Sequence, residues 1–172
     1  MIATDIFKAA DWHDFFLATA GGAAALAGLV FVAMSINLDA IVQNTTHRGR
    51  AINMLTGFTA AFMFCVFALV GGQNHQAVGI EWLVVATGAA VIYVHNYLRA
   101  AKLGGLREEL RPDRLAVGVS CYAAEIVGAV VLILGYVAGL YIAVFGLIIS
   151  FAVLISGAWL LLVAVQEDRS LG

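Results

Sequence analysis

A run of 52 residues, from Leu115 to Gln166, contains a single charged side chain, that of Glu125. As one helix this run would measure about 78 Å, because each residue of an α-helix adds about 1.5 Å, whereas the hydrocarbon core of a bilayer is about 30 Å thick. The run must therefore contain two membrane-spanning helices. We expect the chain to reverse within residues 135–141, where Gly135 and Gly139 give the backbone the freedom that a tight turn needs.

The composition of the whole chain also indicates a membrane protein. Of its 172 residues, 63% are apolar and 12% are charged, and the mean hydropathy is +0.98, whereas soluble domains are about 25% charged. The net charge of −2 gives no reason to expect nucleic acid as a partner. Because a span needs about 20 mostly apolar residues, we predict one all-α transmembrane domain, residues 1–172, with five spans. These spans cover residues 17–37, 51–72, 81–98, 115–137 and 141–166.

The distribution of basic residues predicts the orientation of this bundle. Cytoplasmic loops of membrane proteins collect Lys and Arg. Here basic side chains fall between spans one and two (Arg48 and Arg50), between spans three and four (residues 99–114) and in the C-terminal tail (Arg169). If these three segments are cytoplasmic, only Lys8 lies on the other side. We therefore expect the N-terminus outside and the C-terminus inside.

Two segments outside the spans have helical character. Residues 2–16 mix apolar and acidic side chains and predict a helix on the outer membrane surface. The aspartates in this stretch are unlike a secretory signal peptide, so we expect the spans themselves to insert the protein. Residues 99–114 predict a basic, partly helical segment that Pro112 closes. Its basic side chains either attract anionic lipid headgroups or act only as a topology signal; they are Arg99, Lys102, Arg107, Arg111 and Arg114.

Glu125 is the side chain most suggestive of function. It lies ten residues into the fourth span, about 15 Å deep and near the middle of the membrane. A carboxyl group there is costly unless it is neutral, paired or facing water. It could be the coupling site of a small transporter, or one of a ring of acids in a homo-oligomeric channel. Alternatively, a hydroxyl such as that of Tyr122 or Ser35 binds it and the pair only holds helices together.

Small residues recur at helical spacing in two of the predicted spans. Ala20, Ala24 and Gly28 follow one another every four residues in the first span, and Gly118 and Gly128 lie on the same face as Glu125 in the fourth. Small residues allow membrane helices to approach closely. The pattern predicts tight packing, either within the chain or between copies of it or with another membrane protein.

Aromatic rings and histidines complete the candidate residues. Trp82, Tyr93, Tyr97 and Trp159 fall near predicted span ends, where we expect them to lie at the level of the lipid headgroups. Of the four histidines only His95 falls within a span, so the facing pair that would ligate a haem is not predicted. No ligand spacing predicts a metal site. The sequence also has no nucleophile with its base and no phosphate-binding loop, so we expect no cofactor and no enzymatic activity.

The segment Trp12-His13-Asp14-Phe15-Phe16, followed by GGAAALAGLVFVAMSINLD, resembles a family of uncharacterised small bacterial multi-pass membrane proteins with a WHDFF-type start. The likeness covers about the first half of the chain, as far as Gln73. Some members carry the label "modulator of a membrane-bound protease". The resemblance implies a multi-pass protein of the bacterial inner (cytoplasmic) membrane, and it implies no catalytic or binding residues. It also fits the alternative function, a non-catalytic accessory or regulatory subunit of a larger membrane complex or of such a protease.

Overall fold

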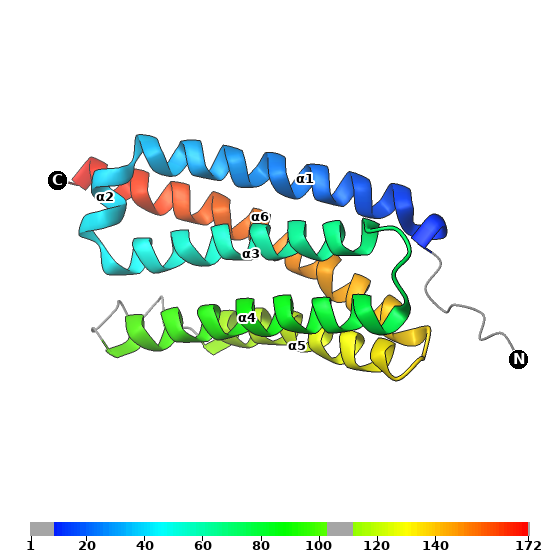
Figure 1. Cartoon of the computed structure of the whole chain (residues 1–172). Helices are drawn as coiled ribbons and strands as arrows, with labels where there is room; N and C mark the ends of the chain where they lie inside the picture. The colour runs from blue at the N-terminus through cyan, green and yellow to red at the C-terminus, as the bar shows by residue number, and fades with distance from the viewer. Residues whose placement is uncertain (1–8, 103–111, 172) are drawn as a thin grey trace, which may run out of the picture.

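The computed structural model describes residues 9–102 and 112–171, and this part of the chain is helical without any β-strand. Five of its helices are long and apolar enough to cross a membrane, which confirms the predicted all-α bundle with five spans. A short helix, α2, joins the first two of these at one end of the bundle (Figure 1). The helices are α1 (Ala9–Ile36), α2 (Leu38–Gln43), α3 (Thr45–Leu69), α4 (His75–Lys102), α5 (Pro112–Ile133) and α6 (Ala138–Leu171).

The predicted helix on the membrane surface is wrong for residues 9–16, because α1 continues through them without a break. Phe16 is fully buried, and the ring of Trp12 lies 5.3 Å from that of Tyr141 on α6. These aromatic side chains pack inside the bundle, so the start of α1 prolongs the first span. The remainder of the predicted surface helix, residues 2–8, lies outside the described residues.

Other boundaries also differ from the prediction. The third span begins at His75 rather than residue 81, because Glu81 is tolerated inside the helix: its carboxylate accepts hydrogen bonds of 2.8 and 2.9 Å from Nε2 of Gln73. Pro112 begins α5 instead of closing the segment before it. Proline suits the first turn of a helix because its missing N–H group would have no partner there.

The reversal between α5 and α6 lies where it was predicted, but only one of its two glycines makes the turn. Gly135 has φ +88°, a conformation that favours glycine. Gly139 belongs to α6, where its missing side chain lets the helix lie against the α5 backbone: an added Cβ would collide with Leu132 and lie 2.6 Å from the carbonyl oxygen of Gly128. Gly128 itself lies against the backbone of Ala143, where an added Cβ would be 2.5 Å from the backbone nitrogen.

Helices α3, α4, α5 and α6 form a ring in which each packs against the next, and α1 packs on the outside against α3. Helix α6 does not stay beside α5. Beyond Gly146 it crosses the bundle, so that Gly157 lies against Met54 of α3 and Leu161 joins an apolar cluster with Val30 of α1. Figure 1 shows α6 beginning beside α5 and ending beside α1. Helices α5 and α6 therefore diverge toward one end of the bundle. This is the end where α3 begins and α4 ends, and we call it the open end.

The opposite end, where α3 ends and α4 begins, is filled with side chains, and we call it the closed end. Trp82 is fully buried there, stacked on Phe64 with ring centroids 3.9 Å apart. Its indole Nε1 donates a 2.9 Å hydrogen bond to the carbonyl oxygen of Phe64. The ring is thus covered by protein atoms, and its polar group has a partner inside the protein. The predicted headgroup position of Trp82 is therefore wrong. Phe16, Leu132 and Leu147 belong to the same buried cluster.

The small residues of the first span do not all pack within the chain. Ala20 and Ala23 are buried, whereas Ala24 and Gly28 are exposed, and a Cβ on Gly28 would meet no atom within 4 Å. Packing through Ala24 and Gly28 inside one chain is therefore wrong, and packing between chains stays a prediction. Gly118, in contrast, is covered by the ring of Tyr93 on α4.

The predicted headgroup segment is described only in part. Arg99 and Lys102 are exposed near the end of α4, and Arg114 lies in the first turn of α5. Arg107 and Arg111 lie outside the described residues. Lipid binding by these five side chains stays a prediction.

Candidate membrane-embedded site

Glu125 lies near the middle of the α5 span and points toward α6 of the same chain. Only 4% of its surface is exposed. The hydroxyl of Ser150 on α6 donates a buried 2.7 Å hydrogen bond to its Oε1. Gly146, one turn before Ser150, leaves room for the acid, since an added Cβ would lie 3.3 Å from Cγ of Glu125. The absence of a side chain at Gly146 thus brings the carboxyl and the hydroxyl together.

Among the described residues, neither of the two hydroxyls suggested by the sequence, those of Ser35 and Tyr122, binds Glu125. Ser35 is exposed on α1 and donates to the carbonyl oxygen of Phe31 in its own helix, at 2.9 Å. It takes no part in the site, so its selection as a candidate is wrong. Tyr122 is buried beside Glu125 and borders the same cavity, but its hydroxyl makes no hydrogen bond to the carboxyl.

Ser150 is the site residue that the sequence reasoning missed. The apolar helices carry other serines with equal claim: Ser120 and Ser156 donate instead to carbonyl oxygens of their own helices, at 2.6 and 2.9 Å. One signal could have found Ser150. Gly139, Ala143, Gly146 and Ser150 follow at spacings of four, three and four, and this stripe of small residues is the face of α6 that packs on α5.

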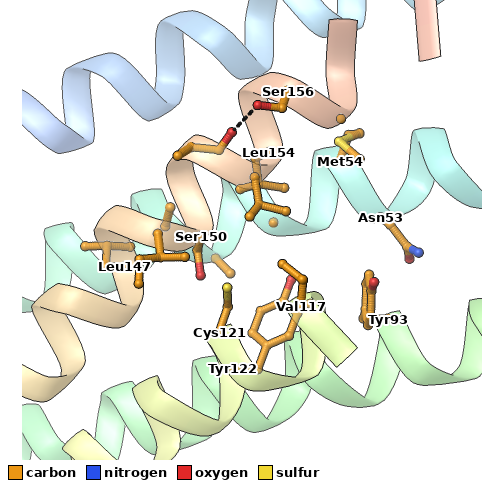
Figure 2. Close-up of a pocket in the computed structure, with 18 of the residues that line it drawn as sticks. Asn53, Met54, Tyr93, Val117, Cys121, Tyr122, Leu147, Ser150, Leu154 and Ser156 are labelled. Carbon is orange, nitrogen blue, oxygen red and sulfur yellow. Dashed lines mark hydrogen bonds between the residues drawn. The ribbon is translucent and has the colours of Figure 1, made fainter. Parts of the chain in front are cut away.

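A cavity of about 580 Å³ opens where α6 diverges from α5. It is lined by side chains of α3, α4, α5 and α6, and its lining runs from the middle of the bundle to the open end. Figure 2 shows Ser150, Cys121, Tyr122 and Tyr93 around this space. Toward the closed end the cavity stops at Phe64, Glu125 and Leu147; toward the open end it reaches Arg50, Tyr97, Val117 and Leu160, and the ring of Tyr93 lies between these ends, against Gly118.

Two tyrosines form one wall of the cavity. The rings of Tyr93 on α4 and Tyr122 on α5 have centroids 5.8 Å apart. Gly118 makes this arrangement possible because a side chain there would occupy the position of the Tyr93 ring. Tyr93 and Tyr97 were predicted to lie at the headgroups, but both line the cavity. Trp159, from the same prediction, is 68% exposed on α6.

The polar groups of the cavity are separated along its length. On α3, Gly57 contacts Leu154, which is one turn of α6 from Ser150. Arg50 precedes Gly57 by seven residues in α3, which places it about 10 Å nearer the open end. Asn53 accepts a 2.8 Å hydrogen bond from Asn96 of α4 between these levels. The site thus has an acid at its inner end and a guanidinium at its mouth.

The cavity also opens sideways. Val117 of α5 and Ile149 and Leu160 of α6 line it and are exposed on the surface of the molecule, at 44%, 38% and 47%. All three belong to membrane-spanning segments. The lining of the cavity between α5 and α6 therefore includes side chains that are also exposed at the surface of the bundle.

Among the described residues, no group of three or more His, Cys, Asp and Glu side chains could hold a metal ion. Within the cavity Glu125 is the one carboxyl group and Cys121 the one thiol.

The sequence matches no protein-family profile, no curated protein and no solved structure. The length and composition of α1, α3, α4, α5 and α6 indicate a multi-pass membrane protein.

Proposed function

We propose that the protein is a small transporter whose solute site is the cavity that ends at Glu125. The observation that carries this proposal is an asymmetry: the cavity reaches the buried acid from the open end, whereas stacked Phe64 and Trp82 fill the bundle on the other side of it. Transporters bind their solutes near the middle of the membrane and expose that site to one side at a time. With the orientation predicted from the basic residues, this cavity faces the cytoplasm.

The position of Glu125 favours a transporter over a channel formed by several copies. A ring of acids around a shared pore requires each carboxyl to face outward from its own chain. Glu125 instead faces α6 of its own chain and is bound by Ser150. One chain contains all the groups of the site.

The same hydrogen bond supports a second candidate, a non-catalytic accessory or regulatory subunit. If Glu125 and Ser150 only hold α5 to α6, the protein acts through its surface rather than through its cavity. The exposed Ala24 and Gly28 on α1 would suit contact with a partner helix. The two candidates differ in whether the charge of Glu125 matters for a flux.

Transport currents in reconstituted membranes distinguish them. Proteoliposomes on a solid-supported electrode are exposed to jumps of protons, Na⁺, K⁺, amino acids and organic cations. We expect a current with at least one of these solutes, and at least a tenfold smaller current with Glu125→Gln. Glu81→Gln is the matched control, because it removes the same charge outside the cavity.

Two results would contradict the transporter. One is the absence of a current with every solute although the protein is correctly inserted. The other is a current of wild-type size in Glu125→Gln. In either case a membrane partner that copurifies from the native membrane would support the accessory subunit.

A further inference from the structure

We infer that the cavity binds hydrophobic organic cations, with the carboxylate of Glu125 as counter-charge and the rings of Tyr122 and Tyr93 along the wall that leads from it toward the open end. This inference rests on the proposed function, since it gives a substrate class to the same cavity. It follows from three properties of the site: the charge at its inner end, the tyrosine rings between that charge and the open end, and the apolar walls.

The charge at the inner end has room for a partner. Oε1 of Glu125 accepts the hydrogen bond from Ser150, and Oε2 accepts none among the described residues. Glu125 nevertheless lines the cavity, so a solute can reach it. A carboxylate in an apolar environment is stabilised when a cation binds next to it. The basic side chain of the cavity, Arg50, lies at the mouth and leaves the inner end to the solute.

The rings favour an organic cation. The faces of tyrosine rings attract a cation within about 6 Å of their centroids. Tyr122 is one turn of α5 from the acid, the ring of Tyr93 lies 5.8 Å from that of Tyr122 on the side of the open end, and Phe64 lines the inner end. A metal ion such as Ca²⁺ would need about six to eight oxygen ligands. The inner end offers mainly the oxygens of Glu125 and Ser150, set in apolar walls.

The size and opening of the cavity favour a solute with a large apolar part. Its volume of about 580 Å³ falls within the range of about 300–1,000 Å³ that is typical of small-molecule sites. Besides the polar groups already named, the walls are made largely of aliphatic side chains, such as Met54, Leu147 and Leu154. The gap between α5 and α6 admits a molecule that is dissolved in the membrane, so the solute need not enter through the polar mouth.

Equilibrium binding of radiolabelled tetraphenylphosphonium to the purified full-length protein in nanodiscs tests the inference. We expect saturable binding of one cation per chain, without competition from tetraphenylborate or from the neutral triphenylphosphine oxide. Glu125→Gln should weaken binding at least tenfold, and the matched control Glu81→Gln should change it less than twofold. Tyr122→Leu should weaken binding more than Tyr122→Phe, because phenylalanine keeps the ring.

A second measurement does not depend on the folding of the Glu125 variant. Cys121 lines the cavity, whereas Cys65 is fully buried and does not. In a Cys65→Ser protein, alkylation of Cys121 by N-ethylmaleimide is followed by intact mass. We expect tetraphenylphosphonium to slow this alkylation at least threefold and tetraphenylborate to leave it unchanged.

The outcomes separate this inference from the proposed function. No saturable binding to the wild type, no protection of Cys121, or equal binding by Glu125→Gln overturns the inference, whether or not another solute is transported. Saturable binding with Cys121 protection supports it even if no current is measured, and in that case the transporter alone fails.

Discussion

At the scale of single residues, the site depends on one buried acid and one hydroxyl. Glu125 is costly in the middle of a membrane, and Ser150 is the group that compensates it within the described chain. Interhelical hydrogen bonds in membrane proteins are worth about 0.6 kcal/mol on average and up to about 1.7 kcal/mol, because partners are also available in the unfolded state. We therefore expect the pair to stabilise the contact between α5 and α6 modestly.

A double-mutant cycle measures this contribution. We expect Glu125→Ala combined with Ser150→Ala to lose less free energy of unfolding than the sum of the single changes, by about 0.6–1.7 kcal/mol. The measurement is unfolding in mixed micelles titrated with sodium dodecyl sulfate. Ser156→Ala is the matched control, because its hydroxyl binds its own helix; its effect should add to that of Glu125→Ala within about 0.5 kcal/mol. Additivity in both cycles would show that the hydrogen bond contributes nothing.

The residues of the site were predictable only in part. Glu125 stands out in the sequence because a lone charge in a long apolar run has few structural uses. Its partner does not stand out, since any of several hydroxyls in the other spans could face it. Which one does depends on the rotation of α6 about its own axis. That rotation follows from the contacts of Gly139 and Gly146 with α5, and hydropathy carries no information about it.

At the scale of helices, the close contact of α5 and α6 and their divergence beyond Gly146 create the cavity. Gly128 and Gly139 bring the two backbones together near the turn. Larger residues further along α6 pack against α3 and α1 instead, which draws the helix away from α5. The position of the small residues therefore determines where the two helices separate.

Replacing one of these glycines tests the close contact. A Cβ on Gly128 would lie 2.5 Å from the backbone nitrogen of Ala143 and 2.7 Å from its Cα, so the helices must move apart. We expect Gly128→Ala to lower the free energy of unfolding by about 1–3 kcal/mol. Gly21→Ala, in open space on α1, should be neutral or raise it by up to about 1 kcal/mol, because alanine favours a helix. Equal effects of the two changes would mean that the contact is not tight.

The helices were predictable from the sequence more completely than their ends. Uncharged runs of sufficient length define the five spans, and glycine marks the turn at Gly135. The ends were missed where a polar side chain is satisfied by a neighbour. Glu81 lies inside α4 because Gln73 binds it, and α1 extends to Ala9 because Trp12 and Phe16 pack on other helices. Such contacts depend on the tertiary structure.

At the scale of the whole molecule, the bundle has one end filled with aromatic side chains and one end with a cavity. The basic residues predict which side of the membrane each end faces. Arg48 and Arg50 of α3 and Arg99 and Lys102 of α4 lie at the open end. By the positive-inside rule we expect this end to be cytoplasmic, and the odd number of spans would then place the N-terminus outside.

Reporter fusions test this orientation in a bacterial host. We expect green fluorescent protein fused after Gly172 to fluoresce and alkaline phosphatase at the same position to be inactive, because the first folds in the cytoplasm and the second requires export. Fusions after Gly72, between α3 and α4, should show the opposite pattern. An active phosphatase at Gly172 would place the mouth of the cavity on the outer side.

The gap between α5 and α6 has a consequence for how affinity must be measured. A solute that arrives through it is first concentrated by the bilayer, so its apparent dissociation constant combines a partition coefficient with the intrinsic constant of the site. Two compounds with the same fit to Glu125 and its tyrosines would then differ in potency by the ratio of their solubilities in lipid. Titrations at several lipid-to-protein ratios separate the two factors, because partitioning scales with the amount of lipid and occupancy of the site does not.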